Sequence, residues 1–459
     1  MSALWHWAEA QGACLGKASA AFSATGVSID TRSLKPGDLF VALTGDARDG
    51  HDFVDSALAA GASAALVSRK GMSAGPLLEV GHTLRALEDL GDAARARLLG
   101  QVVAVTGSAG KTTTKEMLRL ACSALGRVHA SAASYNNHWG VPLTLAQMPR
   151  DSEYAVIEIG MNHFNEIRSL VRLVRPHVAL ITTIAPAHIE FFGTLEGIAD
   201  AKAEIFEALV PGGCAILPAD NPLYPRLVER ARRAGVTRVL SFGRHDGVDA
   251  RLLETSDAND GQQIVADIAG QPVRLRLGAK GEHIATNAVA ALLCIAQLGG
   301  DVLNAAASLS SFTALKGRGA RRVLRLKEGE IELIDESYNA NPASMRAALT
   351  MLGRARVSGR RIAVLGDMLE MGESAPHYHR ALADDIAAQG IDLVFACGEA
   401  MRALWQALPE ARRGGYGRSS QELAPQLVAA LTPGDMVLIK GSLGSKMAVI
   451  LDALTAASG

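Results

Sequence analysis

Residues 102–125, VVAVTGSAGKTTTKEMLRLACSAL, place a short glycine-rich loop between an apolar run and a helical pattern. Val102–Val105 predicts a buried strand, and Lys111–Leu125 has the periodicity of a helix. Glycines let backbone N–H groups wrap a polyphosphate, and the N-terminus of the helix adds its dipole. The lysine can reach phosphate oxygens, and the threonine hydroxyl after it can bind Mg²⁺. The predicted phosphate-binding residues are Gly107, Ser108, Ala109, Gly110, Lys111, Thr112 and Thr113.

The loop is shorter than the usual P-loop, because Val105 stands where the first glycine of that motif is expected. A glycine turn with a chance lysine is the alternative interpretation. The strand–loop–helix context disfavours that alternative, and we predict phosphate binding.

Three further apolar runs follow the loop, and polar residues stand at or just after their ends. The runs are Tyr154–Ile159, Val178–Thr183 and Cys214–Leu217. In a parallel α/β sheet, ligands bind beyond the carboxyl ends of the strands. An acid such as Glu158 is costly to bury unless it meets a cation, so we assign it to Mg²⁺. An exposed carboxylate at a strand end is the alternative.

Length, charge and cysteine usage exclude several classes of protein. A chain of 459 residues exceeds what one core supports, so we expect two or three domains. Lysine and arginine number 46 against 47 acidic residues, so no field favours nucleic acid or an acidic membrane. Five scattered cysteines predict reduced thiols in a cytoplasmic protein. We expect no signal peptide, no membrane span and, from the balanced charge, a monomer.

Shifts in pattern divide the chain near residues 82 and 313. We expect a small N-terminal α/β domain over 1–82, a central P-loop domain over 83–313, and a Rossmann-like domain over 314–459. Within the central domain, residues 237–280 alternate as in an antiparallel appendage. The expected N-terminal elements are strands Leu39–Leu43 and Ala64–Ser68 and helix Phe53–Ala60. The expected C-terminal strands are Ile331–Ile334, Arg361–Leu365, Leu393–Ala396 and Met436–Ile439. The expected C-terminal helices are Ala343–Gly353, His379–Gln389, Gln421–Leu431 and Met447–Ala457.

Two groups of polar residues downstream suit a nucleotide. His283 and Asn287 share one face of a predicted helix, where a ring and an amide could meet a base. Ordinary polar residues at the start of a helix explain His283 and Asn287 equally well. Arg318 and Asp335 could grip phosphate and ribose when the domains close, although ordinary loop and strand-end charges have the same pattern.

Four stretches together resemble the Mur ligase family, the ATP-dependent amide-bond-forming enzymes of peptidoglycan assembly. They are NNHWGVPLTL at 136–145, IDESYNANP at 334–342, VLGDMLEMG at 364–372 and KGS at 440–442. DTR at 30–32, PGDLFVAL at 36–43 and Gly45 with Asp49-Gly50-His51 resemble the UDP-sugar-binding domain of that family. The likeness is strongest to members that add D-alanyl-D-alanine to UDP-N-acetylmuramoyl-tripeptide through an acyl phosphate.

The resemblance implies a catalytic and metal-binding set in the central domain. By spacing alone, His188 reads as a structural histidine and Lys202 as a solvated lysine. The resemblance implies instead that both are catalytic, together with Lys111 and Glu158. It implies Mg²⁺ held by Thr112, Glu158 and His188, and a carbamoylated Lys202 that helps to hold a second Mg²⁺.

The resemblance also implies the contacts to ATP and to the two substrates. Asn287 matches an adenine-contacting asparagine, with His283 stacking nearby, and Arg318 and Asp335 match nucleotide contacts from the C-terminal domain. The N-terminal domain would bind the UDP-muramoyl peptide, and the C-terminal domain the incoming dipeptide. The implied substrate-binding residues are Thr31, Arg32, Thr44, Asp49, Asn136, Asn137, Asn339 and Asn341.

Two other functions stay open at this point. The sibling ligase that adds the diamino acid shares the N-terminal domain type, and the four stretches disfavour it. A nucleotide-dependent switch or a transporter-coupled ATPase could use the same loop without a UDP-sugar-binding domain. The chain departs from the family pattern at Trp139 and at Leu443, where an arginine often follows Lys-Gly-Ser.

Overall fold

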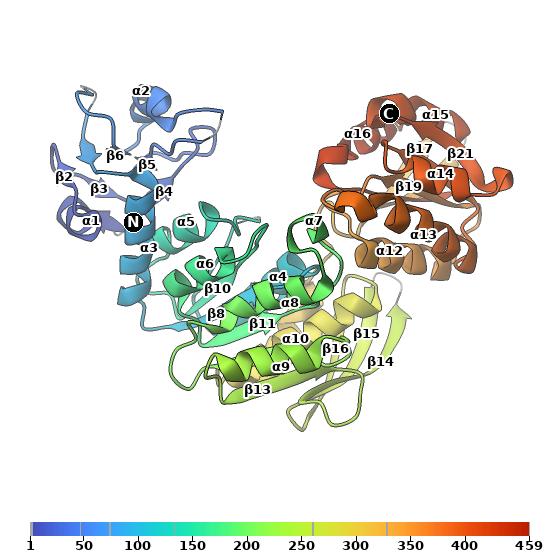
Figure 1. The fold of residues 1–459 in the computed structure, drawn as a ribbon, viewed down its shortest axis with the longest axis horizontal. Helices are drawn as coiled ribbons and strands as arrows, with labels where there is room; N and C mark the ends of the chain where they lie inside the picture. Colours follow the sequence, from blue (N-terminus) through green and yellow to red (C-terminus); the bar gives the residue numbers. More distant parts are fainter. Residues whose placement is uncertain are drawn as a thin grey trace.

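The computed structural model describes residues 3–45, 47–72, 75–132, 134–258, 261–326 and 329–458. Within these ranges the chain forms three α/β units, each with its own main sheet (Figure 1). The blue N-terminal unit and the red C-terminal unit lie on either side of the central unit. No helix in the described ranges is long and apolar enough to cross a membrane. The expected three-part α/β architecture is confirmed.

The N-terminal unit is a five-stranded sheet in the order β2-β7-β6-β5-β4, preceded by a short β1–β3 pair. The predicted strands and helix are confirmed within two residues at their ends. Strands β1, β2, β3, β4 and β7 were not predicted, since each is only two or three residues long, and neither were helices α1 and α3. The strands are β1 (Trp5–His6), β2 (Lys17–Ala18), β3 (Ser23–Ala24), β4 (Gly26–Ser28), β5 (Asp38–Val41), β6 (Ala64–Val67) and β7 (Leu77–Glu79). The helices are α1 (Trp7–Cys14), α2 (Val54–Ala59) and α3 (Thr83–Arg97), which leads into the central unit.

The central unit is a nine-stranded sheet in the order β16-β15-β14-β13-β12-β11-β8-β10-β9. Strands β8 to β13 pair in parallel, and β14 joins β13 in parallel before β14, β15 and β16 pair antiparallel with one another. The antiparallel appendage predicted over 237–280 is confirmed for β14 to β16 and wrong for β13, which extends the parallel sheet. The strands are β8 (Gln101–Thr106), β9 (Val128–Ala130), β10 (Tyr154–Glu158), β11 (Val178–Ile181), β12 (Cys214–Pro218), β13 (Arg238–Gly243), β14 (Ala250–Ala258), β15 (Gly261–Ile268) and β16 (Gln271–Leu277). The helices are α4 (Lys111–Ser123), α5 (Gly140–Ala146), α6 (Glu166–Val174), α7 (Ile189–Phe192), α8 (Leu195–Ala203), α9 (Tyr224–Arg233), α10 (Glu282–Gln297) and α11 (Val302–Ser308).

Both faces of the central sheet are covered, which explains why β8 is apolar at nearly every position. Successive side chains of a strand point to opposite faces. Accordingly, Val102 and Ala104 lie in a core with residues of α3, α5, α6, α8 and α9. Val103 and Val105 lie in a second core with residues of α4, α10 and α11. The sheet therefore presents its carboxyl edge, where the β8–α4 loop lies, as the place for a ligand.

The C-terminal unit is a six-stranded sheet in the order β17-β18-β22-β19-β20-β21. The four predicted strands and four predicted helices are confirmed, whereas β17, β21 and α14 were not predicted. The strands are β17 (Ala320–Leu326), β18 (Gly329–Glu336), β19 (Arg361–Gly366), β20 (Leu393–Cys397), β21 (Arg413–Gly417) and β22 (Met436–Lys440). The helices are α12 (Pro342–Arg354), α13 (Ala375–Ala388), α14 (Arg402–Ala407), α15 (Ser420–Ala430) and α16 (Ala448–Ala457).

The first two units share packing across the point where the sequence changes pattern. Trp5 Nε1 in β1 donates to the carbonyl of Ala146 at 2.8 Å, and Trp5 is fully buried. One hydrophobic cluster contains residues of both units, from Leu4 to Val236. We propose domain boundaries near residues 82 and 313, since the three main sheets occupy residues 17–79, 101–277 and 320–440.

Candidate active site

The β8–α4 loop adopts a conformation that depends on two glycines. Gly107 has φ 150°, and a Cβ there would lie 1.9 Å from Thr182 Oγ1. Gly110 has φ 80°, and a Cβ there would lie 2.6 Å from Asn287 Nδ2. Neither position has room for a side chain, so the loop passes directly beside β11 and α10. The predicted adenine contact, Asn287, is thereby placed next to the predicted phosphate-binding loop.

Lys111 begins α4 and turns back over the loop. Its Nζ donates to the carbonyl of Gly107 at 2.7 Å. Desolvation lowers the pKa of this ammonium, Arg318 lowers it further, and the nearby Glu158 carboxylate opposes both effects. The side chain thus occupies the position from which a lysine can meet a bound phosphate.

Glu158 ends β10 and is 1% exposed, with one carboxylate oxygen that no group bonds. Its Oε1 accepts a hydrogen bond from Asn136 Nδ2 at 2.7 Å, whereas Oε2 has no partner among the described residues. Thr112 Oγ1 lies 3.4 Å from Ser134 Oγ, and Thr112 and Glu158 line the same pocket. A buried carboxylate oxygen without a hydrogen-bond partner, in the same pocket as a threonine hydroxyl, fits a divalent cation, which prefers oxygen ligands.

His188 lines the same pocket and is held by the C-terminal unit. It has a left-handed backbone, φ 59°, and its imidazole forms an ion-pair contact with Glu370. Glu190 N donates to the carbonyl of Glu370 at 3.2 Å. In the described part of the chain, no three His, Cys, Asp or Glu side chains form a ready-made metal cluster. The role of His188 as a metal ligand stays a prediction.

Lys202, near the end of α8, is 1% exposed and is not among the residues that line the pocket. Its Nζ lies 3.3 Å from Met161 Sδ, a pocket residue. Desolvation and the charge of Lys111 hold the pKa of Lys202 well below its usual value. The solvated-lysine interpretation from spacing alone is therefore wrong, because the side chain is buried.

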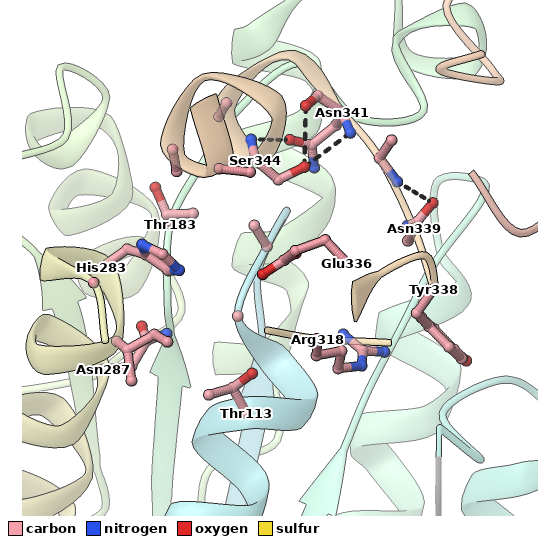
Figure 2. Close-up of a pocket in the computed structure, with 18 of the residues that line it drawn as sticks. Thr113, Thr183, His283, Asn287, Arg318, Glu336, Tyr338, Asn339, Asn341 and Ser344 are labelled. Carbon is pink, nitrogen blue, oxygen red and sulfur yellow. Dashed lines mark hydrogen bonds between the residues drawn. The ribbon is translucent and has the colours of Figure 1, made fainter. Parts of the chain in front are cut away.

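The central and C-terminal units together enclose a pocket of about 1560 Å³. Figure 2 shows His283 and Asn287 on one side, Arg318 and Tyr338 on the other, and Glu336 between them. The guanidinium of Arg318 lies 4.0 Å from the Tyr338 ring centre, and its Nη2 donates to Ser134 Oγ at 3.3 Å. Thr113 also lines this pocket. Its size suits a nucleotide together with part of a second substrate.

Asp335 and Glu336 are adjacent in β18, but their side chains have different surroundings. Asp335 is fully buried, and it accepts hydrogen bonds from Gly317 N at 3.0 Å and Ser337 Oγ at 2.6 Å. It supports the turn that carries Arg318 and is not among the pocket-lining residues. Glu336 lines the pocket, where Lys440 Nζ donates to it at 3.0 Å. Glu336, which the sequence analysis did not select, thus lines the pocket, whereas Asp335 does not, and the nucleotide contact of Asp335 stays a prediction.

The neighbouring asparagines Asn136 and Asn137 serve two different pockets. Asn136 faces Glu158, as described above. Asn137 Oδ1 accepts from Gly140 N at 2.9 Å, close to the start of α5, and lines a second pocket of about 510 Å³. This second pocket lies between the N-terminal and central units, and its other lining residues are Thr44, Gly45, Ser68, His82, Thr83, Leu84, His138 and Trp139.

Three predicted substrate contacts in the N-terminal unit do not line either pocket. Thr31 and Arg32 lie outside both, and Arg32 instead pairs with Asp30 at 2.6 Å. Asp49 accepts from His51 Nδ1 at 2.6 Å and from Arg69 Nη2 at 2.9 Å. These bonds hold the turn beside Thr44. The substrate contacts of all three residues stay predictions.

Asp49→Asn is expected to lower the melting temperature at neutral pH by roughly 2–4 °C. Hydrogen bonds from His51, together with Arg69, lower the pKa of Asp49 from its usual 3.8 to about 2. A lowered pKa stabilises the fold above pH 3.8, and this contribution is lost as the pH falls toward 2. Melting curves should show that the difference in melting temperature between the wild-type chain and Asp49→Asn becomes smaller as the pH falls over that interval. The control is Asp52→Asn, which removes the other partner of Arg69 at a more exposed carboxylate. Equal effects of both variants would contradict the prediction.

Three family models match the chain in succession: the Mur ligase family catalytic domain at residues 23–120, the Mur ligase middle domain at 105–295, and the Mur ligase glutamate ligase domain at 321–443. A UDP-N-acetylmuramoyl-tripeptide--D-alanyl-D-alanine ligase of Escherichia coli is 36% identical and covers 93% of both chains. The ligase of the same name from Rickettsia prowazekii is 32% identical and covers 93% of this chain and 94% of its own.

Solved structures agree with these relatives over nearly the whole chain. The crystal structure of MurF from Acinetobacter baumannii matches with a TM-score of 0.87 and 31% identity, covering 98% of this chain and 99% of its own. MurF ligase from Thermotoga maritima in complex with ADP matches with a TM-score of 0.80 and 26% identity, covering 94% and 97%. All three parts of the chain are matched in their order. The chain belongs to the Mur ligase family.

Proposed function

We propose that this chain is the ligase that joins D-alanyl-D-alanine to UDP-N-acetylmuramoyl-tripeptide and converts ATP to ADP and phosphate in the same reaction. The observation that carries the proposal is full-length similarity, above 30% identity, to several ligases of that name. The pocket between the central and C-terminal units supports it, because a phosphate-binding loop and an opposing polar wall meet there.

The chemistry needs an activated carboxyl group, since oxide is a poor leaving group at neutral pH. The tripeptide carboxylate attacks the γ-phosphoryl group of ATP, which gives an acyl phosphate and ADP. The amine of the dipeptide then attacks the acyl carbon, and phosphate leaves. Two anions must approach each other in the first step. Lys111, at the start of α4, and Arg318, from the C-terminal unit, supply positive charge for that approach.

Mg²⁺, bound with ATP, would supply further charge neutralisation, and Thr112, Glu158 and His188 are the residues that would hold it. The unpartnered Glu158 oxygen fits this assignment. The buried, readily deprotonated amine of Lys202 fits carbamoylation, because a neutral amine is the form that reacts with carbon dioxide. A carbamate at this position would provide a carboxylate for a second Mg²⁺.

The two pockets divide the substrates between them. The pocket with Thr44 and Asn137 would hold the UDP-muramoyl part of the acceptor, and the large pocket would hold ATP, the tripeptide end and the dipeptide. Asn339 and Asn341 stand on the side of the large pocket formed by the C-terminal unit. We propose a cytoplasmic protein, which is consistent with the five buried, unpaired cysteine thiols. From the balanced charge we propose a monomer.

Phosphate release from Mg-ATP, with each cosubstrate added alone and then with both together, tests the proposal. Release is expected to require UDP-muramoyl-tripeptide and D-alanyl-D-alanine together, with a product heavier by the condensed dipeptide. Turnover with a free diamino acid and UDP-muramoyl-dipeptide would assign the chain to the sibling activity. Release that is indifferent to every acceptor would leave a nucleotide hydrolase and overturn the ligase assignment.

A further inference from the structure

The C-terminal unit reaches the phosphate-binding loop through the buried side chain of Asn341. Asn341 is the N-cap residue of α12, where its Oδ1 accepts from Ser344 N at 2.9 Å and Ser344 Oγ accepts from Asn341 N at 3.0 Å. This reciprocal pair is a capping box (Figure 2). The Asn341 amide has a nitrogen left over, and Nδ2 donates to the carbonyl of Ser108 at 3.2 Å. One partner can only donate and the other can only accept, so the orientation of the amide is fixed.

The central unit holds the same part of the loop from the other side. Ser108 N donates to the carbonyl of Thr183 at 2.9 Å, and Ser108 Oγ donates to the carbonyl of Ala185 at 2.9 Å. The carbonyl of Ala109 accepts from Thr182 Oγ1 at 2.6 Å. In this segment, the carbonyl of Ser108 is thus the group that accepts a hydrogen bond from the C-terminal unit.

The direction of that carbonyl sets the direction of the next N–H group. A trans peptide is planar, so the carbonyl of Ser108 and the N–H of Ala109 point in opposite directions. An anion is bound by N–H groups and repelled by carbonyl oxygens. If this peptide rotated, it would exchange a donor for an acceptor in a loop whose residues line the large pocket. The Asn341 donor opposes that rotation, because it would leave a buried amide without its acceptor.

We propose that Asn341 is a positioning residue that couples docking of the C-terminal unit to the phosphate-binding form of the loop. The proposal rests on the proposed function, since it takes the loop to bind the phosphates of ATP. Coupling is reciprocal, so a bound nucleotide also strengthens the docking of α12. Asn341 was predicted as a substrate contact, and this proposal gives it a role toward the loop.

Two variants separate the donor from the helix cap. Asn341→Ser keeps a good N-cap residue but cannot reach Ser108, and Asn341→Asp keeps the capping oxygen but replaces the donor with a carboxylate oxygen. Calorimetric titration of the full chain with Mg-ADP is expected to give roughly three- to tenfold weaker binding for Asn341→Ser and a larger loss for Asn341→Asp. The control is Ser419→Ala, which removes the side-chain cap of α15 in the same unit, away from the pocket.

Hydrogen exchange provides the second measurement. In the wild-type chain, Mg-ADP is expected to slow amide exchange in residues 343–349, and this slowing should be lost in Asn341→Ser. If the wild-type chain binds no ADP, both the proposed function and the coupling are overturned. If the wild-type chain binds ADP and both Asn341 variants bind within twofold of it, the coupling is overturned and the function stands. Equal weakening by Ser419→Ala would also overturn the coupling, because general destabilisation would then explain the loss.

Discussion

Lys111→Ala is expected to lower kcat/KM for ATP by at least about a thousandfold, which corresponds to roughly 4 kcal/mol of transition-state stabilisation. The ammonium lies at the start of α4, 2.7 Å from the carbonyl of Gly107, inside the loop that would hold the phosphates. Charge develops on the transferred phosphoryl group, and a fixed cation in a partly dehydrated site stabilises it strongly. Steady-state kinetics with both cosubstrates measure the effect.

Lys111→Arg provides the control for charge. It keeps a cation, but a planar guanidinium cannot replace a compact ammonium that bonds the Gly107 carbonyl. A loss of at least a hundredfold is therefore expected here as well. Melting temperatures of both variants should stay within a few degrees of the wild-type value. If Lys111→Ala kept more than a tenth of the activity with a normal KM for ATP, the loop would not be the phosphate site.

The sequence predicts the sheets well wherever strands are buried on both faces. Val102–Val105 and Met436–Ile439 are continuous apolar runs, Arg361–Leu365 is apolar after its first residue, and each forms a strand inside its sheet. In the C-terminal unit, the two missed strands lie at the edges of the sheet and have an unusual composition. Strand β17 carries three arginines at one edge, and β21, at the other, is RGGYG with three glycines. Such strands are formed by pairing with a neighbour, and local propensity does not reveal them.

The candidate site shows a similar limit for single side chains. The phosphate-binding loop could be predicted, because its glycines, lysine and threonine have a fixed spacing that the chemistry requires. Which of Asp335 and Glu336 lines the pocket could not be predicted, because this depends on which of the two carboxylates accepts a hydrogen bond from the turn at Gly317. The contact from Asn341 to Ser108 joins residues 233 positions apart, which no local pattern contains.

Residues of the N-terminal unit were the hardest to assign. Thr31, Arg32 and Asp49 belong to stretches that resemble a family motif, and in the structure Arg32 and Asp49 bond to side chains of their own unit. A motif residue that shapes a turn and one that touches a ligand look the same in a sequence. Thr44 lines the second pocket and Asp49 does not, and the substrate contacts of both residues stay predictions.

Glu158→Gln is expected to lower ligase activity by at least about a hundredfold and, at the same time, to raise stability by roughly 1 kcal/mol. The two effects have one cause. Glu158 is 1% exposed, and among the described residues one of its oxygens has no hydrogen-bond partner, so the burial of its negative charge is only partly compensated until a cation binds. Gln keeps the size of the side chain and the oxygen that accepts from Asn136 Nδ2. Melting curves recorded without metal measure the change in stability. Electron paramagnetic resonance measures the change in Mn²⁺ affinity.

Glu204→Gln is the matched control for burial of a carboxylate. Glu204 is 5% exposed, and its two oxygens accept from Asn165 N at 2.8 Å and Arg168 N at 3.0 Å. Replacing one oxygen with an NH₂ group leaves a backbone N–H without an acceptor, so this variant is expected to lower the melting temperature and to leave Mn²⁺ affinity unchanged. If Glu158→Gln raises the melting temperature and Glu204→Gln lowers it, Glu158 is identified as the buried carboxylate that binds a cation. A lower melting temperature for both variants, with Mn²⁺ affinity unaltered by Glu158→Gln, would make Glu158 a structural residue and remove it from the metal site.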